Sequence, residues 1–272
     1  LEIAFLEPLS ALTQAGDITH TLLVEADFVA MADGVSDEEA RARVAAAIQS
    51  ANPNLVVFCR YNGPLADAVL AAARQHGAAV LYHLDDDILN IPRTLGAKKH
   101  ARYHEPERLA AVRALLAAAD LVYCSTQPLA LRIASLGLAR AVANGPLAAA
   151  SDILAPAAPR PVTTIGYMGG SDHAHDFALA VPGLAAFLAR HETVRFELFS
   201  SMPLPKPLKT FGARVQHLPA VHGYRDFRQA FAARSWDIGL CPLHDSDFNR
   251  LKSDVKWLEY TSTGTAVIAS AG

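Results

Sequence analysis

Short apolar runs of four to seven residues alternate with alanine-rich stretches of helical period along the chain. This alternation is typical of βαβ units, in which helices cover a parallel sheet. The first half predicts strands at 3–5, 21–24, 55–58, 79–82 and 121–124, and helices at 37–49, 65–75, 105–118 and 127–136. The second half predicts strands at 163–167, 194–199, 215–218, 238–241 and 266–269, and helices at 177–190, 224–233 and 254–262.

Residues 144–161 separate the two series of strands. They are rich in proline, alanine and glycine and show little periodicity, which indicates a linker. The chain has 272 residues, 51% of them hydrophobic, enough for two cores of ordinary size. We therefore expect an α/β protein with two Rossmann-like domains, residues 1–150 and 151–272, facing a cleft.

Composition excludes several classes of function. The formal net charge is -3, the isoelectric point is about 6.4, and the basic residues are scattered, so no nucleic-acid partner is expected. Cys59, Cys124 and Cys241 each lie in an apolar run typical of a buried strand and have no metal-ligand spacing, which favours reduced core thiols in a cytoplasmic protein. No apolar run approaches the ~20 residues of a membrane span, although peripheral membrane contact stays open.

The dinucleotide and phosphate-loop motifs are both missing. No G-x-G-x-x-G follows a predicted strand, and no G-x-x-x-x-G-K-[ST] occurs. This argues against a dinucleotide oxidoreductase and against a P-loop NTPase. Parallel sheets bind ligands beyond the carboxyl ends of their strands, so the loops that follow the strands are the places to search.

The strongest chemical signal lies in residues 248–260. Ser253 or Asp254 is a good N-cap, and Asn249 and Lys252 lie just ahead of the helix start. Free N–H groups at a helix start together with a lysine suit a diphosphate. Lys252 is therefore predicted to bind phosphate.

Lys256 and Glu259 are three residues apart on the same predicted helix, so they share a face. An ammonium near the phosphates and a carboxylate one turn deeper could bind a nucleotide's phosphate and ribose together. An ordinary lysine–glutamate pair on a helix surface has the same spacing, and the spacing alone does not separate the two interpretations.

The loop Gly169-Gly170-Ser171 follows the first strand of the second half. Glycines there would let the backbone approach phosphate or sugar closely, although a plain strand-to-helix turn fits as well. His173 and Asp176 share one side of the following helix start, where they could form a metal or catalytic pair, or a solvated pair.

The first half offers a second group of polar residues. Asp85, Asp86 and Asp87 suggest a divalent metal, but neighbours on an extended segment point to opposite faces, so a loop that faces the cleft is the preferred interpretation. His83 ends the preceding strand and Arg60 ends the strand at 55–58. Each could face the cleft, or be an ordinary core or surface residue.

Several of these blocks resemble a known family. Asp237 to Leu243, the block from Phe248 to Tyr260, Gly264 and the following apolar strand resemble the donor-binding region of GT-B glycosyltransferases related to family 4. Weaker similarity covers residues 82–92, 119–126, 144–145 and 165–176. The resemblance implies a retaining enzyme that takes a sugar from a nucleotide-diphosphate donor. It implies neither a cofactor nor a bound metal.

The resemblance also assigns roles. Glu259 matches the family's second motif glutamate, associated with the donor ribose, whereas the first motif position holds Leu251. His173 and Asp176 match an H-x-x-D step near the donor. The predicted catalytic residues are His83, Asp85 and Lys252. The predicted donor-binding residues are Gly169, Gly170, Ser171, His173, Asn249, Lys252, Ser253, Lys256 and Glu259.

Two other functions remain open at this point. A non-hydrolysing nucleotide-sugar epimerase uses a similar fold, with His83, Asp85 and His173 as the candidate acid–base groups. A non-catalytic nucleotide-sugar-binding module would be consistent with Leu251, which replaces the first motif glutamate. The acceptor expected by analogy is a cell-surface or lipid-linked glycan.

Because the sequence stops just after the strand at 266–269, roughly 50 to 100 further residues are expected in the whole protein.

Overall fold

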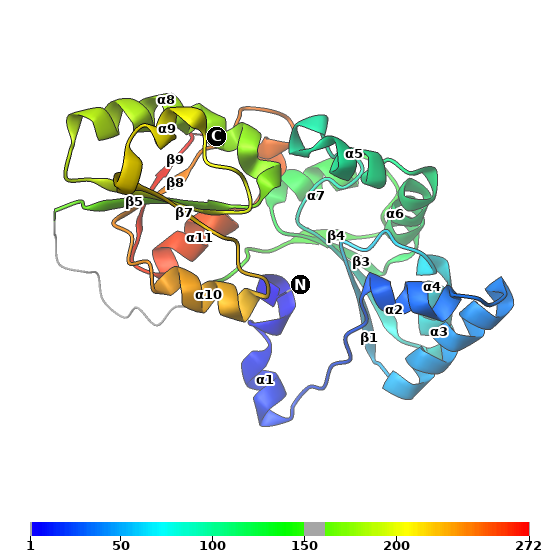
Figure 1. Cartoon of the computed structure of the whole chain (residues 1–272). Helices are drawn as coiled ribbons and strands as arrows, with labels where there is room; N and C mark the ends of the chain where they lie inside the picture. The colour runs from blue at the N-terminus through cyan, green and yellow to red at the C-terminus, as the bar shows by residue number, and fades with distance from the viewer. Residues whose placement is uncertain (1, 150–160, 272) are drawn as a thin grey trace.

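The computed structural model describes residues 2–149 and 161–271 and contains two parallel sheets (Figure 1). The first sheet has the order β1-β2-β3-β4. Its strands are β1 (Leu55–Cys59), β2 (Ala79–Leu84), β3 (Leu121–Cys124) and β4 (Val142–Asn144). The second sheet has the order β7-β6-β5-β8-β9. Its strands are β5 (Thr164–Gly169), β6 (Arg195–Ser200), β7 (Val215–Leu218), β8 (Ile238–Cys241) and β9 (Ala266–Ala269). The predicted α/β class with two parallel sheets is confirmed.

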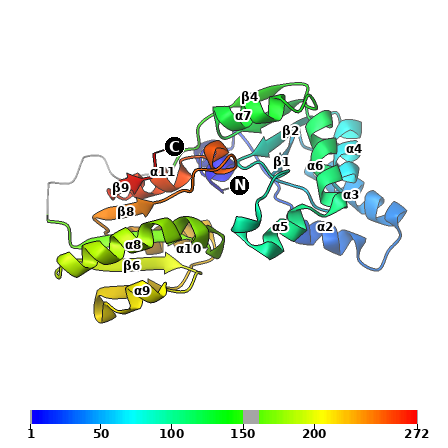
Figure 2. The same cartoon turned by 90° about the horizontal axis from the view of Figure 1, so that it is seen from above.

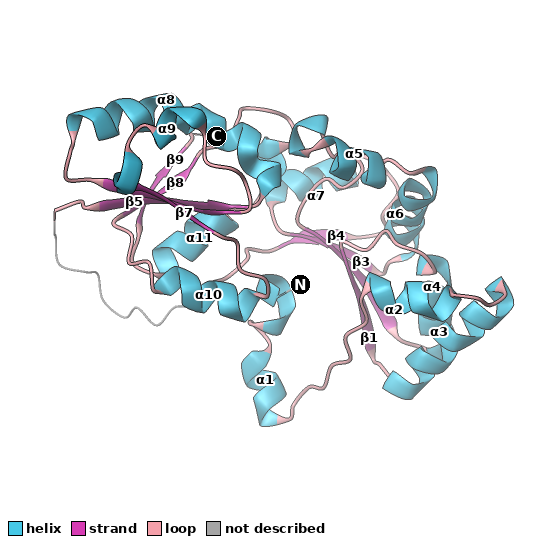
Figure 3. Cartoon of the chain, viewed as in Figure 1, coloured by secondary structure: helices cyan, strands magenta, loops and turns pink. Residues whose placement is uncertain are grey.

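Helices connect the strands and cover the sheets (Figure 3). The first half contains α1 (Ser10–Ala15), α2 (Glu25–Ala32), α3 (Asp37–Ala51), α4 (Ala66–His76), α5 (Ala97–Tyr103), α6 (Pro106–Ala118) and α7 (Gln127–Ala134). The second half contains α8 (Ala174–Arg190), α9 (Lys206–Lys209), α10 (Tyr224–Ala232) and α11 (Val255–Ser262). In the second half α8 and α9 lie on one side of the sheet and α10 and α11 on the other (Figures 1 and 2).

Side chains alternate between the two faces of the second sheet, and both faces are buried. On β5, Tyr167 belongs to the core under α8, whereas Met168 belongs to the core under α10 and α11. On that second face a Cβ at Gly166 would lie 1.9 Å from the Trp236 ring. Gly239 is restricted in the same way by Tyr260, at 2.7 Å. These glycines therefore let two large aromatic rings pack flat on the sheet.

Two predicted strands at the start of the chain are wrong. Glu2–Leu6 is a π-helical turn whose backbone bonds locally, with Glu7 N–H donating to the Glu2 carbonyl at 3.0 Å. Residues 21–24 form no strand and pair with none in the described chain, and the Val24 N–H donates instead to the Asp27 carboxylate at 2.7 Å at the start of α2. Local hydrogen bonds thus replace the expected ladder.

Several elements were missing from the sequence prediction: α1, α2, α5, α9 and strand β4, which ends where the linker was expected to begin. The predicted domain boundary at 150/151 and most of the linker lie in residues 150–160, outside the described residues. None of the helices in the described part of the chain is long and apolar enough to cross a membrane.

Candidate functional site

The order of the second sheet defines where a ligand can bind. The chain runs outward from β5 to β6 and β7, then returns to the other side of β5 with β8 and β9. In such sheets the strand order reverses at a switch point, and ligands bind beyond the carboxyl ends of the two strands that flank it. Here those strands are β5 and β8. The loops that follow them contain most of the predicted donor-binding residues.

The loop after β5 is fixed to the end of β6. The carbonyl of Gly169 accepts a hydrogen bond from the Ser200 hydroxyl, and the Ser171 N–H donates to the Ser201 hydroxyl at 3.0 Å. Gly170 is the N-cap of the short 3-10 turn Ser171–His173, which leads into α8. The predicted strand-to-helix turn is present, and direct binding of phosphate or sugar by this loop stays a prediction.

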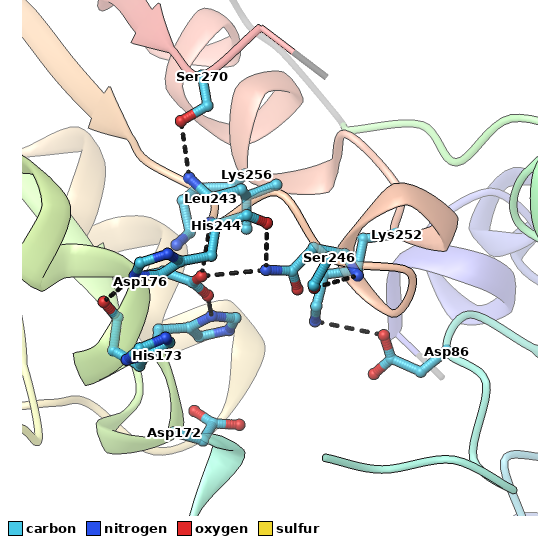
Figure 4. Close-up of polar contacts among 12 residues, drawn as sticks. Asp86, Asp172, His173, Asp176, Leu243, His244, Ser246, Lys252, Lys256 and Ser270 are labelled. Atoms are coloured by element: carbon cyan, nitrogen blue, oxygen red, sulfur yellow. Dashed lines mark hydrogen bonds and ion pairs between the residues drawn. The ribbon is translucent and has the colours of Figure 1, made fainter. Parts of the chain in front are cut away.

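Asp176 joins the loops that follow β5 and β8 (Figure 4). Its buried carboxylate accepts from the His244 N–H at 3.0 Å and from the Asn249 side-chain amide at 3.1 Å, and it lies 3.5 Å from His173 Nδ1. Burial alone raises the pKa of Asp176. The hydrogen bonds from His173 and His244 outweigh this effect and hold the pKa below its ordinary value. Asp176 thus holds two predicted donor-binding residues, His173 and Asn249, in one network.

The start of α11 differs from the prediction in one respect. Asp254 occupies the N-cap position, but neither its side chain nor that of Ser253 caps the helix. The backbone at Asp254 has φ -83° and ψ 18°, outside the extended conformation that directs a capping side chain at the first-turn N–H groups. The prediction of a side-chain N-cap is therefore wrong, and those N–H groups keep no side-chain acceptor from residue 254.

Lys256 is partly buried on the first turn of α11. Its Nζ donates to the Tyr167 hydroxyl at 3.2 Å and lies 4.7 Å from the centre of that ring. None of the carboxylates in the described ranges lies within 4.0 Å of this ammonium. Burial lowers the pKa of Lys256. The structure therefore holds a partly buried cation near the switch point, with no salt-bridge partner among the described residues.

Glu259 lies one turn further along α11 and lines a cavity of about 490 Å³ between α10 and α11. Tyr224 and Arg228 of α10 and Glu7 of the N-terminal segment also line it, and Arg228 lies 3.3 Å from Glu7. Burial raises the pKa of Glu259 to about 7, and the Lys256 charge only partly offsets this. The alternative of an exposed lysine–glutamate pair does not describe these two partly buried side chains.

The acidic triplet at the end of β2 is matched by basic side chains. Asp85 and Asp86 both pair with Arg60, at 3.0 and 3.2 Å, and Asp86 also lies 3.3 Å from Lys252. Asp87 pairs with Arg132 at 3.2 Å. Burial alone lowers the pKa of Arg60, but the carboxylates of Asp85 and Asp86 outweigh it and raise the pKa. Lys252, which follows β8 in the sequence, thus lies next to the loop that follows β2 (Figure 4).

His83 lies near the end of β2, two residues before Asp85, and its ring is enclosed by the first half of the chain. It is 1% exposed, its Nδ1 lies 3.5 Å from the Cys59 thiol, and Phe5 and Tyr123 contact its ring. Burial lowers its pKa to about 4, which keeps the ring neutral near pH 7. The structure brings together Lys252 and Asp86, but it places His83 in the core of the first sheet. A catalytic role for His83 stays a prediction.

Three parts of the site were not found from the sequence. His244 and the pair formed by Tyr224 and Arg228 come from loop and helix segments that show no motif. Lys99 pairs with Asp172 at 2.7 Å and connects α5 to the loop after β5. A histidine just past a strand end could have drawn attention to residue 244, because the loops after parallel strands hold the ligand.

No protein-family model and no curated protein matches the chain. Solved structures do match the fold at low sequence identity. Sucrose-phosphate synthase from Thermosynechococcus elongatus is 16% identical, with a TM-score of 0.57 over 95% of this chain and 64% of that one. TarM is 9% identical, with a TM-score of 0.52 over 85% of this chain and 44% of that one.

The pneumococcal O-GlcNAc transferase GtfA in complex with UDP and GlcNAc is a third match. It is 14% identical, with a TM-score of 0.51 over 84% of this chain and 44% of that one. The chain spans 44% to 64% of the length of these proteins. The two parallel sheets thus match the fold of GT-B glycosyltransferases.

Proposed function

We propose that the chain transfers a sugar from a nucleotide-diphosphate sugar to an acceptor. One observation carries the proposal: Lys256 and Glu259, three residues apart on α11, are both partly buried beside the switch point of the second sheet. An ammonium without a salt-bridge partner and a carboxyl held near neutral pH are costly in a folded protein. Such groups are found together where a ligand compensates them.

A nucleoside diphosphate compensates both groups. Its phosphates supply the negative charge that Lys256 lacks, together with Lys252 and the uncapped N–H groups at the start of α11. The ribose hydroxyls donate to Glu259, and the 490 Å³ cavity is of the size that small-molecule ligands occupy. As the sugar departs, charge develops on the diphosphate, and these same groups stabilise it.

The remaining assignments complete the proposal. Residues 1–150 would provide the acceptor side, with Asp85 and His83, and residues 151–272 the donor side, with Gly169, Gly170, Ser171, His173, Asn249 and Ser253. The resemblance in residues 237–270 supports retention of configuration. In this proposal the nucleotide-sugar is the co-substrate, and no further cofactor or metal takes part. The acceptor is a cell-surface or lipid-linked glycan. The protein is cytoplasmic and works either free or in peripheral contact with a membrane. GtfA, one of the similar structures, holds UDP and a sugar.

Thermal unfolding with UDP, GDP and ADP, followed by their sugar conjugates, tests the donor. A ligand at 100 times its Kd stabilises the folded state by about 2.7 kcal/mol. Mass spectrometry and chromatography of the same samples then detect released or transferred sugar. Stabilisation without turnover in an acceptor screen would favour a non-catalytic binding module. A sugar that changes configuration without any acceptor would favour an epimerase. No stabilisation by any nucleotide would contradict donor binding.

A further inference from the structure

The segment Phe248–Lys252 follows β8 in the sequence but packs against the first sheet. Phe248 is 8% exposed and belongs to the same hydrophobic cluster as the buried residues of β1, β2 and β3. Leu251 packs against that cluster as well. The leucine that replaces the first motif glutamate therefore anchors the segment to the first half of the molecule.

A hydrogen bond fixes the backbone of the same segment. The Thr126 hydroxyl donates to the Leu251 carbonyl at 2.8 Å, directly before Lys252. The same hydroxyl caps α7 by accepting from the Leu129 N–H at 3.2 Å. Since α7 packs on β3 and β4, Thr126 connects a rigid part of the first half to the peptide that precedes the predicted phosphate-binding lysine.

The side chain of Lys252 is also held from the first half, by Asp86 at 3.3 Å. At the other end of the segment, Asn249 is held from the second half by Asp176. The segment therefore bridges the two sheets (Figure 4). Both the backbone and the ammonium of Lys252 depend on residues far away in the sequence.

We propose that Thr126 is a positioning residue for the phosphate site of the donor. This role rests on the proposed function. Thr126 fixes the Leu251 carbonyl and so limits the backbone conformations that Lys252 can adopt. A lysine side chain that is already fixed binds phosphate more tightly than a mobile one, because the entropy cost of ordering it is incurred on folding and not on binding.

Hydrogen exchange without ligand tests the docking of the segment. Thr126→Val removes the donor and also the α7 cap, whereas Thr126→Ser keeps a hydroxyl for both. The Ser36 hydroxyl caps α3 by accepting from the Glu39 N–H at 3.2 Å. Ser36→Ala removes this cap and serves as a control for the loss of a helix cap elsewhere in the chain. We expect the amides of residues 249–253 to exchange at least tenfold faster in Thr126→Val alone. Unchanged exchange would overturn the docking role.

The second measurement is the ratio of affinities for a nucleoside diphosphate and its nucleoside, using UDP, GDP and ADP with uridine, guanosine and adenosine. Thr126→Val should reduce this ratio about tenfold, Thr126→Ser should restore it, and Ser36→Ala should leave it unchanged, since general destabilisation lowers both affinities alike. Faster exchange with an unchanged ratio would overturn the positioning role. A parent chain that binds no nucleoside diphosphate would overturn the proposed function and this role with it, while the exchange result still reports the docking.

Discussion

The acidic triplet after β2 and the Lys256–Glu259 pair of α11 lie at the carboxyl edges of the two sheets and differ in how their charges are paired. At the first edge Asp85, Asp86 and Asp87 are matched by Arg60, Arg132 and Lys252, three carboxylates with three cations. At the second edge Lys256 has no salt-bridge partner among the described residues and Glu259 has a pKa raised to about 7. Both edges end parallel strands of the same fold class. Strand-end position alone therefore does not distinguish them.

Under the proposed function, this difference marks the second edge as the one that binds the donor. In a matched cluster the charges already compensate one another, so removing one member leaves an unpaired charge and costs stability. A cation without a partner costs stability as long as no ligand is bound, so removing it costs binding but not folding. The two edges should therefore respond to substitution in opposite ways.

Lys256→Met gives the largest expected effect. The variant should bind UDP, GDP or ADP on the order of 100-fold more weakly than the parent, because one charge-assisted contact contributes about 1.5–3 kcal/mol. Binding of the bare nucleoside should change little. The free energy of unfolding should stay level or rise, since burial already lowers the pKa of this lysine. Isothermal titration and urea unfolding measure the two quantities.

The exposed Lys209 at the end of α9 provides the matched control. Lys209→Met should alter neither quantity. If Lys256→Met unfolds the chain more easily and binds nucleotide as the parent does, Lys256 is a structural residue and the contrast between the edges fails.

Glu259→Gln tests the same edge through pH. The folded-state pKa of about 7 lies above the ordinary value of 4.5, so the native state holds this proton more tightly than the unfolded state. The free energy of unfolding of the parent should therefore fall as pH rises from about 4.5 to about 7, by about 2 kcal/mol. Glu259→Gln should remove this fall and be the more stable protein above pH 7. Urea unfolding from pH 4 to pH 8 measures it.

The exposed Glu192 gives a control in Glu192→Gln, which should leave the pH profile of the parent intact. The ligand arm uses UDP and its 2′-deoxy counterpart: Glu259→Gln should weaken the ribonucleotide more than the deoxynucleotide. Equal losses would remove Glu259 from the ribose.

Lys252 follows a strand of the second sheet but pairs with Asp86 at the first edge. Lys252→Ala should weaken binding of a nucleoside diphosphate about tenfold, less than Lys256→Met does, because Asp86 already compensates part of the charge of Lys252. The stability cost should also be small, since Arg60 still pairs with Asp86. Calorimetric titration with the diphosphate and the nucleoside checks this. A loss as large for the nucleoside as for the diphosphate would contradict a phosphate contact.

Much of the fold was predictable because local periodicity determines most of it. The strands from β1 to β3 and from β5 to β9 fall where apolar runs predicted them. The fold of the first 24 residues was not predictable in this way. Phe5 and Val24 fall in apolar runs typical of strands, but the Phe5 carbonyl accepts from the Leu9 N–H and Val24 is the N-cap of α2. Apolar runs show that a segment can be buried, but they do not reveal whether a neighbouring strand is available to pair with it.

The site was predictable in part for the same reason. Lys256 and Glu259 are close in sequence, so helical spacing alone placed them on one face. The contact between Lys252 and Asp86 joins residues 166 positions apart, and the contact between Thr126 and Leu251 joins residues 125 apart. Spacing carries no information about such pairs, because only the packing of the two halves brings them together.

The smallest expected effect concerns metal at the first edge. Three adjacent aspartates suit a divalent cation by composition, but in this fold each carboxylate already has a guanidinium or ammonium within 3.3 Å, and a metal would have to displace these partners. We therefore expect EDTA, and Mg²⁺ or Mn²⁺ at millimolar concentration, to change the unfolding midpoint and any glycosyl transfer by less than the experimental scatter. Asp87→Asn, which weakens the pair with the half-exposed Arg132, should by contrast lower the free energy of unfolding by about 1 kcal/mol, because the buried Asp87 carboxylate accepts hydrogen bonds from Arg132 and Asn90. Activity that EDTA abolishes and Mn²⁺ restores would show that the first edge also awaits a ligand, and the contrast between the two edges would then be wrong.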